Sequence, residues 1–283
     1  MLLEKLERAD GFSDAERKIA AYILKRRENV LGLTIRELAA DTYSSNPTIV
    51  RLCRKIGVGG FREFKIVLSS ELERAAGVEK VDANIPFDGR EEARAIAERI
   101  AGLTRSTVRD AYSLLDGAAL DAAASAIGEA RQVYLFAVGD SMIRAMSFQG
   151  KLLKIGRPVQ ISNFLQEQGY HASNAAEGDC ALFITYHARQ PEYLRYAETM
   201  RERGVRLIAV TADARGELAQ RCGIVLPLPL DEEPAGKIAT FSSQIAIDYV
   251  LNVLYSCVFN LRYEHHFRIK QDNQDYVERI TRS

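Results

Sequence analysis

The sequence contains only four cysteines, and no two of them lie close together in the chain. The absence of a Cys-x-x-Cys pair argues against a zinc module and a disulfide framework, and favours a reducing compartment. The N-terminus carries charges where a signal peptide needs an apolar stretch. The most apolar late segment, Ile245–Leu261, is interrupted by Asp248 and Asn252 and is short for a bilayer span. We therefore expect a cytoplasmic protein with no membrane partner.

The chain also lacks a net charge, since 38 basic residues balance 38 acidic ones. This balance argues against general polyanion binding but conceals a local excess. Residues 1–77 hold 14 basic residues against 11 acidic ones, and five bases in Tyr43–Leu68 are opposed only by Glu63. A basic patch on a neutral protein is typical of a nucleic-acid contact, although a solvated helix face gives the same pattern.

Signatures of cofactor and metal chemistry are missing as well. Gly139 stands without the rest of a Gly-x-Gly-x-x-Gly set, and Gly236-Lys237 lacks both the first glycine and the hydroxyl residue of a phosphate-binding loop. His265 and His266 are adjacent, so on a helix they point about 100° apart and cannot chelate one metal together. We expect no cofactor, no metal and no catalytic residue.

Helix-start signals organise the first 77 residues. Ser13–Glu16 and Thr34–Glu37 both have the pattern of a capping box, in which a hydroxyl and a glutamate satisfy each other's backbone amides. A further helix is predicted from about Ser45 to Ile56, because its apolar residues recur with helical spacing. Gly57 then ends it. Two short helices joined by a tight turn, the second bearing bases, form the helix-turn-helix arrangement.

In that arrangement the start of the second helix meets base edges or phosphates. The candidate contacts with a double-stranded DNA operator fall into three groups. The polar residues at the helix start could equally serve only as caps, so spacing alone leaves DNA binding open. The groups are Ser45, Asn46 and Thr48 at the helix start, Arg51 and Arg54 further along, and Lys55, Arg62 and Lys65 as contacts with the DNA backbone.

From Arg131 onward, short apolar runs alternate with helical patterns of ten to fifteen residues. This alternation predicts parallel βαβ units and a layered α/β fold. The predicted domains are a helical helix-turn-helix domain at 1–77, a linker at 78–89 and an α/β domain at 90–283. The predicted strands are Val133–Val138, Val159–Ile161, Ala181–Thr185, Leu207–Thr211 and Ile224–Leu228.

Two loops of the α/β domain carry the candidate effector-binding residues. In parallel sheets ligands gather beyond the carboxyl ends of the strands, where helix N-termini offer amides to anions. Polar helix caps stand at the same places in any such domain, and that interpretation also remains open. The candidates are Gly139 and Ser141 after the first strand, and Thr185, His187, Arg189 and Gln190 after the third.

The run TIRELA, then TIVRLCRKIG, then GFREFK, resembles the N-terminal domain of the RpiR/MurR family of transcriptional regulators. Residues 132–260, with VYLFAVGDS and DCALFITYHARQPE, are similar to the sugar isomerase (SIS) domain that follows in this family. The resemblance implies that Ser45–Lys55 reads DNA. It also implies a phosphosugar effector, bound by the serine after the first strand and by a serine- and threonine-rich loop after the third.

The sequence departs from the family pattern in that second loop. His187, Ala188 and Gln190 stand where serine, glycine and threonine are usual, and Asp140 adds a negative charge beside the expected phosphate site. A carboxylate beside a phosphate lowers affinity unless a cation such as Arg189 or protonated His187 compensates it. A phosphosugar, another polar metabolite and a pocket without a ligand all remain open.

We expect a ligand-gated transcriptional regulator that is not an enzyme. The alternative is a SIS-type phosphosugar isomerase, for which Glu232, Glu233 and His187 are candidate bases. A palindromic operator favours a homodimer or homotetramer. The helix Ile245–Leu261 and the tail Arg262–Ser283 are candidate interface elements, although a core position suits the helix equally.

Overall fold

The computed structural model describes residues 2–27, 29–75 and 81–281. The chain divides into two compact units, residues 1–115 and 116–283. Residues 78–80 of the predicted linker and the last two residues of the predicted tail lie outside the described residues.

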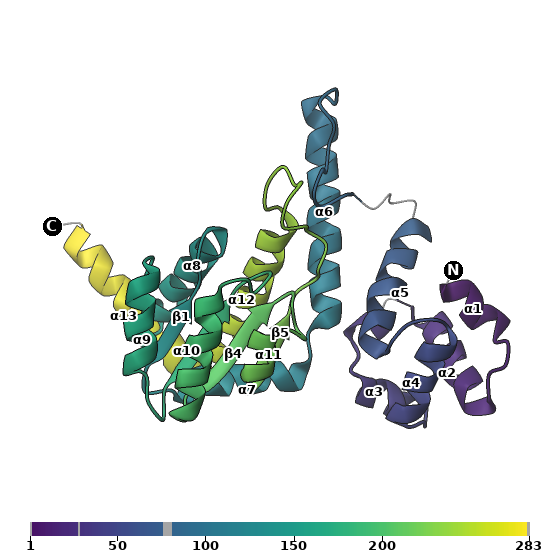
Figure 1. Ribbon diagram of the computed structural model, residues 1–283, viewed down its shortest axis with the longest axis horizontal. Helices are drawn as coiled ribbons and strands as arrows, with labels where there is room; N and C mark the ends of the chain where they lie inside the picture. The colour runs from purple at the N-terminus through teal and green to yellow at the C-terminus, as the bar shows by residue number, and fades with distance from the viewer. Residues whose placement is uncertain (1, 28, 76–80, 282–283) are drawn as a thin grey trace. The chain divides into compact units, whose positions relative to one another are not determined.

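The first unit is helical (Figure 1). Both capping boxes predicted from the sequence are present, since Ser13 and Thr34 accept from the amides of Glu16 and Glu37 while those glutamates accept in return. The elements are α1 (Leu2–Arg8), α2 (Asp14–Lys25), the 3-10 helix η1 (Asn29–Gly32), α3 (Ile35–Asp41), α4 (Asn46–Lys55), α5 (Phe61–Ala75) and α6 (Ala93–Leu114).

One apolar core joins α1 to α5. Ile49 and Leu52 of α4 are buried against Leu38 of α3 and Phe64 of α5, as the helical spacing predicted. Helix α1 was not predicted. Its first amides are satisfied from a distant part of the chain, because the buried carboxylate of Glu71 accepts from the amides of Leu2 and Leu3. No local cap signals such a start.

Helix α6 packs against α5 and η1 and so falls within the first compact unit. The predicted α/β domain, residues 90–283, includes this helix. The compact units and the sequence pattern thus assign α6 to different parts of the chain. The domain limits 1–77, 78–89 and 90–283 stay a prediction.

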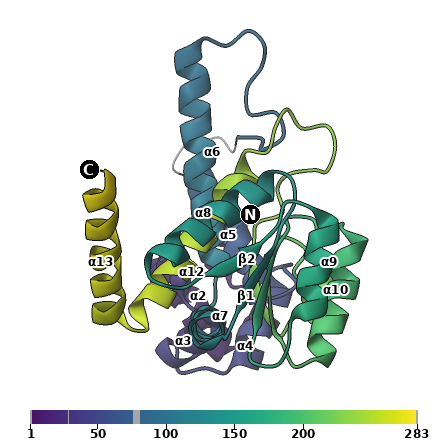
Figure 2. The same ribbon diagram turned by 90° about the vertical axis from the view of Figure 1, so that its left-hand side faces the viewer.

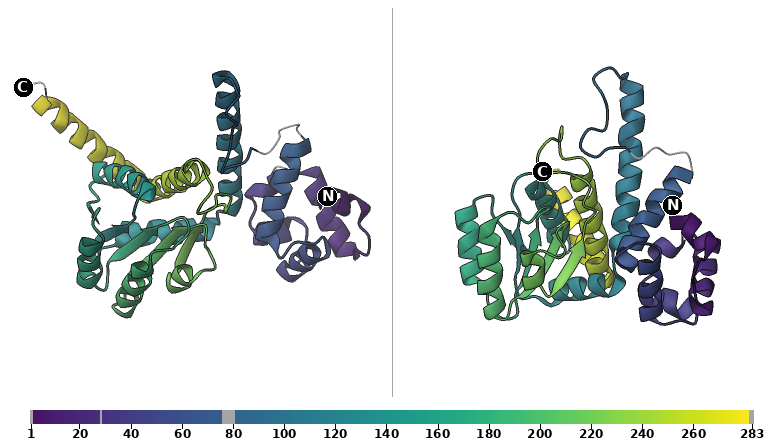
Figure 3. Two further views of the ribbon diagram at one scale, coloured as in Figure 1. Left: turned by 45° about the horizontal axis from the view of Figure 1, so that its top comes forward. Right: turned by 45° about the vertical axis from the view of Figure 1, so that its right-hand side comes forward.

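The second unit is a three-layer α/β structure, as predicted. Its parallel sheet has the order β2-β1-β3-β4-β5 and lies between α8 with α12 on one face and α9, α10 and α11 on the other (Figure 3). The strands are β1 (Val133–Phe136), β2 (Val159–Ile161), β3 (Cys180–Ile184), β4 (Arg206–Thr211) and β5 (Ile224–Pro227). The helices are α7 (Gly117–Glu129), α8 (Asp140–Lys154), α9 (Leu165–Asn174), α10 (Pro191–Glu202), α11 (Glu217–Arg221), α12 (Ser242–Asn260) and α13 (Tyr263–Thr281).

The strand order places a topological switch point between β1 and β3. These strands are paired in register, with Phe136 opposite Phe183. The helices that follow them, α8 and α10, depart to opposite faces of the sheet (Figure 3). The loops after β1 and β3 therefore open a crevice at the carboxyl edge of the sheet, which is where ligands bind in open α/β folds.

Helices α12 and α13 form the end of the second unit (Figure 2). Within the described residues, no single helix combines the length and apolar character needed to cross a membrane. Helices α12 and α13 reach the required length and apolar character only as a pair, and the chain bends by 104° between them.

Candidate DNA-reading helix and effector pocket

Helix α4 is fixed at its start by its own side chains. Ser45 is the N-cap and accepts from the Thr48 amide at 3.4 Å, and the two hydroxyl oxygens lie 2.9 Å apart. Pro47 in the first turn suits a helix start, where the missing amide hydrogen is not needed. The capping role of these polar residues is therefore real, whatever else they contact.

The face of α4 opposite the core is basic. Ile49, Leu52 and Cys53 are buried, whereas Arg51 and Arg54 are exposed. The Arg51 guanidinium donates to the Thr48 hydroxyl at 3.3 Å, which links its orientation to the helix cap. Because the buried stripe fixes how α4 lies on the unit, both arginines point into solvent.

Two other candidate DNA contacts lie against groups of the protein itself. The Lys55 ammonium donates to the Gly11 carbonyl at 2.9 Å and to Glu16 at 2.6 Å. Lys65 is only 6% exposed, donates to the Leu33 carbonyl at 3.3 Å and lies over the Phe61 ring. These lysines therefore hold helices together.

The remaining candidates, Asn46 and Arg62, differ in exposure: Asn46 is half-buried at the start of α4, and Arg62 is exposed at the start of α5.

The Lys55–Glu16 pair shapes the electrostatics beneath α4. The Glu16 side chain is 4% exposed, and burial alone would raise its pKa. The hydrogen bonds from Lys55 and from Ser13 outweigh burial, so that the pKa of Glu16 is lowered and the carboxylate stays ionised.

A second site lies in the α/β unit at the switch point. A pocket of about 200 Å³ opens at the carboxyl edge of the sheet, and three loops contribute to it. Five of the six predicted effector-binding residues line this pocket. The sixth, Gly139, lies between Val138 and Asp140, which also line it. The lining residues are Val138, Asp140, Ser141, Thr185, Tyr186, His187, Arg189, Gln190, Lys237, Thr240, Ser243 and Gln244.

The loop after β1 turns at Gly139, whose φ of 57° and ψ of −138° suit glycine alone. Helix α8 begins directly afterwards, and Gly139 supplies no side chain to cap it. Asp140 and Ser141 of the first turn of α8 line the pocket, so the positive end of the helix dipole lies beside it. Such a helix start attracts an anion.

The loop after β3 is held in a bent form. The Thr185 hydroxyl donates to the Gln190 side-chain oxygen at 3.0 Å, and Ala188 between them has a φ of 51°, a left-handed value that side chains disfavour. His187 has a buried Nε2 with no hydrogen-bond partner in the part of the chain that the structure describes. Burial, followed by the charges of Lys237 and Arg189, lowers the pKa of His187, so its imidazole is neutral near pH 7.

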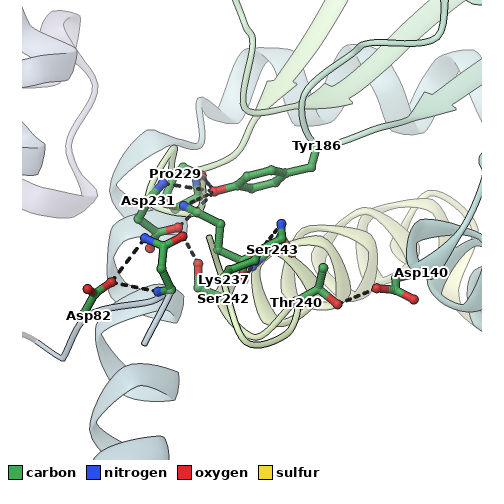
Figure 4. Close-up of polar contacts among 11 residues, drawn as sticks. Asp82, Asp140, Tyr186, Pro229, Asp231, Lys237, Thr240, Ser242 and Ser243 are labelled. Atoms are coloured by element: carbon green, nitrogen blue, oxygen red, sulfur yellow. Dashed lines mark hydrogen bonds and ion pairs between the residues drawn. The ribbon is translucent and has the colours of Figure 1, made fainter. Parts of the chain in front are cut away.

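The third loop, between β5 and α12, was not predicted to belong to the site. Its anchor is the buried Tyr186 hydroxyl, which donates toward the Pro229 carbonyl at 2.7 Å and accepts from the amides of Asp231 and Glu232 at 3.0 and 3.2 Å (Figure 4). Burial raises the pKa of Tyr186 well above its usual value. The tyrosine of the second loop thus ties the third loop to the pocket.

Lys237 reaches the pocket from this third loop. Its ammonium lies 3.1 Å from the Glu232 carboxylate, whose side chain is fully buried. Glu232 also accepts from the amide and hydroxyl of Ser243, at 3.0 and 2.7 Å. Glu232 was a candidate base for the isomerase alternative, but in this geometry its oxygens bind the loop and the start of α12.

Asp140 at the start of α8 also has a partner. The Thr240 hydroxyl donates to its carboxylate at 2.5 Å and bridges the third loop to α8 (Figure 4). The negative charge that the sequence placed beside the phosphate site is therefore engaged by a hydroxyl. Arg189 and Lys237 add two positive charges to the pocket lining.

Comparison with known proteins assigns both units. Residues 1–75 match the helix-turn-helix domain of the rpiR family, and residues 126–254 match the SIS domain. The HTH-type transcriptional regulator HexR of Pseudomonas aeruginosa is 32% identical over 233 residues, which cover 82% of this chain and 80% of that protein. The chain belongs to the RpiR family of transcriptional regulators.

Other RpiR-type relatives agree with this assignment. HexR of Escherichia coli is 27% identical and covers 82% of this chain and 79% of its own length. Both HexR proteins are named as transcriptional regulators and not as enzymes. The regulator expected from the sequence is thereby confirmed over the isomerase alternative.

Solved structures share the fold of this RpiR-family chain. NanR of Vibrio vulnificus, solved with ManNAc-6P, has a TM-score of 0.61 and 22% identity, and the match covers 99% of both chains. The sugar isomerase domain of an RpiR transcription factor from Sphaerobacter thermophilus has a TM-score of 0.57 and 16% identity over 63% of this chain and 98% of its own.

Proposed function

We propose that this regulator is controlled by a small phosphorylated sugar bound in the pocket at the switch point. The observation that carries the proposal is the buried Nε2 of His187, which has no hydrogen-bond partner among the described residues. It lies in a pocket that Arg189, Lys237 and the start of α8 also line. A phosphate suits such a set of donors and positive charges. Asp140 with Thr240 and Gln190 with Thr185 offer acceptors for sugar hydroxyls. The ManNAc-6P bound to NanR supports this ligand class.

The proposal assigns reading of the operator to the exposed face of α4. Arg51 and Arg54 contact base edges or phosphates, and Asn46 at the helix start contacts the groove. Ser45 and Thr48 cap the helix and orient Arg51. Lys55 and Lys65 act indirectly in this proposal, because they hold α4 and α5 in place.

The regulator acts as a homodimer or a dimer of dimers in the cytoplasm under this proposal. Its support is an apolar groove of about 770 Å³ along α12, from Tyr249 to Tyr263. Helix α13 continues it with Phe267, Tyr276 and Val277, all more than 40% exposed. Exposed apolar surface of this extent is typical of an interface, and two copies supply the two reading helices that a palindrome needs.

The effector proposal is tested by calorimetry on the full chain with hexose 6-phosphates, N-acetylhexosamine 6-phosphates, the unphosphorylated sugars and inorganic phosphate. We expect one phosphosugar to bind at least about tenfold more tightly than its unphosphorylated form, because the phosphate forms charge-assisted hydrogen bonds. Ser141→Ala should weaken this binding without changing DNA affinity in the absence of effector. Equal binding of both forms of the sugar would refute the assignment.

Dimer formation is tested by sedimentation velocity. Tyr276→Asp places a charge in the exposed apolar face of α13 and should raise the dissociation constant strongly, while Gln274→Asp on the same helix should not. A wild-type chain that remains monomeric at micromolar concentration would contradict the interface.

A further inference from the structure

Within the described residues, four helices end with the same pair of backbone hydrogen bonds. In each, the residue after the C-cap has a positive φ, and the amides of that residue and the next bond back to the last turn, which is the Schellman motif. The ends of α4, α8 and α10 use glycine for the left-handed position, namely Gly57, Gly156 and Gly204. The end of α3 uses Tyr43, with a φ of 51°.

The hydrogen bonds at the end of α3 follow the motif in full. The Tyr43 amide donates to the Ala40 carbonyl at 3.2 Å, and the Ser44 amide donates to the Ala39 carbonyl at 2.8 Å. The backbone is therefore locked in a conformation that a tyrosine side chain disfavours. Glycine relieves this strain at the three equivalent positions, so the tyrosine is not needed for the turn.

The side chain of Tyr43 contributes no packing to the folded protein. It is 98% exposed, whereas no other large apolar side chain among the described residues exceeds 68%. An aromatic ring that is strained and almost wholly in water has no stabilising role within the chain.

We propose that Tyr43 contacts the DNA operator beside α4, through its hydroxyl to a phosphate and its ring to the adjoining sugar. The inference rests on α4 as the reading helix. Tyr43 lies two residues before the Ser45 N-cap, and the start of a reading helix is the part that enters the groove. The neighbouring acid, Asp41, is engaged by the Tyr22 hydroxyl. Tyrosine hydroxyls are among the groups that bind DNA phosphates in such interfaces.

The test uses the full chain and an operator duplex. The wild-type protein selects this duplex from fragments of the DNA upstream of its own gene. Tyr43→Gly removes both the strain and the contact, so its melting temperature should not fall while its operator affinity falls by about tenfold. Tyr43→Phe keeps the ring, so its operator affinity should fall less than that of Tyr43→Gly. The salt dependence should match that of the wild type, because a neutral hydroxyl displaces no counterion.

Gly204→Ala is the matched control for strain alone, since Gly204 has the same position at the end of α10 with a φ of 74°. It should lower the melting temperature and leave operator affinity unchanged. Unaltered operator affinity in Tyr43→Gly would overturn the proposal. A change in the oligomeric mass of Tyr43→Gly without DNA would overturn it in favour of a protein partner. Failure of the wild type to select any duplex would instead refute α4 as the reading helix.

Discussion

The two units present their functional groups in different ways. In the helical unit one element, α4, carries the reading face, and its arginines are exposed because the core side of the helix is fixed by Ile49 and Leu52. In the α/β unit no single element carries the pocket. Three loops after β1, β3 and β5 meet there. They are connected by the Tyr186 hydroxyl, which accepts from the Glu232 amide, and by the Thr240 hydroxyl, which donates to Asp140.

This difference predicts how each site should respond to mutation. The exposed arginines of α4 contribute little to folding, so their loss should affect DNA binding alone. Most residues that line the pocket are half-buried or buried, and several hold loops together, so their loss should affect ligand binding and stability at once.

Arg51→Ala and Arg54→Ala should each weaken operator binding about 10-fold to 100-fold, since a guanidinium contact with a base or phosphate contributes roughly 1–3 kcal/mol. The melting temperature should stay within about 2 °C of the wild type, because surface substitutions change stability little. Anisotropy titrations at several salt concentrations measure the effect. Arg201→Ala on α10 removes one positive charge outside α4 and serves as the control. Unchanged operator affinity in both α4 variants would show that α4 is not the reading helix.

Lys237→Met should weaken binding of an anionic effector by about tenfold or more, because a charge-assisted hydrogen bond is lost from the pocket. It also leaves the buried Glu232 carboxylate without its cation, so stability should fall as well. Lys237→Met combined with Glu232→Gln should recover the stability but not the ligand affinity. Calorimetry measures the effector affinity and thermal melts measure the stability. Recovery of both quantities in the double variant would show that Lys237 does not bind the effector.

Tyr186→Phe should destabilise the α/β unit by about 1–3 kcal/mol, since the hydroxyl satisfies buried backbone groups of the third loop. Tyr196→Phe provides a partly exposed control, because its hydroxyl donates only to the Leu165 carbonyl. Urea melts compare the two variants. Equal losses would show that the Tyr186 anchor is not special.

These contacts also explain how much the sequence could predict. The capping boxes at Ser13 and Thr34 and the buried stripe of α4 are local patterns, so the helix-turn-helix was predicted closely. The loops after β1 and β3 were predicted from strand alternation. Lys237 and Thr240 were missed, because they come from a loop about 50 residues further along the chain. Contacts between distant residues, those of Tyr186 with that loop and of Thr240 with Asp140, bring it to the pocket. Tyr43 was missed because no sequence pattern reveals a left-handed φ at a tyrosine.

Lys55→Met should lower the free energy of unfolding of the helical unit by about 1 kcal/mol, because the Glu16 carboxylate loses its cation. The loss is small because the Lys55 side chain is 43% exposed, so that water screens its charge. The loss should be seen above the usual pKa of glutamate and should vanish as the pH falls through the lowered pKa of Glu16. Urea melts at pH 7 and near pH 3 test this. An equal loss at both pH values would exclude the ion pair as its cause.

Effector binding should strengthen modestly as the pH falls from 8 toward 6. Burial and the neighbouring cations lower the pKa of His187 in the free protein, and a bound anion should raise it, so binding takes up a proton. A sulfate ester of the sugar keeps its charge over this range and isolates the histidine. His187→Gln should abolish the dependence; its persistence in that variant would assign the proton to another group.

The most direct test of the whole account measures the energetic coupling between the two sites. Operator affinity is determined with and without saturating effector, and effector affinity with and without saturating operator, for the full chain at one salt concentration. We predict that the two affinity ratios differ from one and are equal, as linkage requires. Ser141→Ala should weaken the effector binding through which this coupling acts. Operator affinity that is identical with and without a bound effector would contradict it.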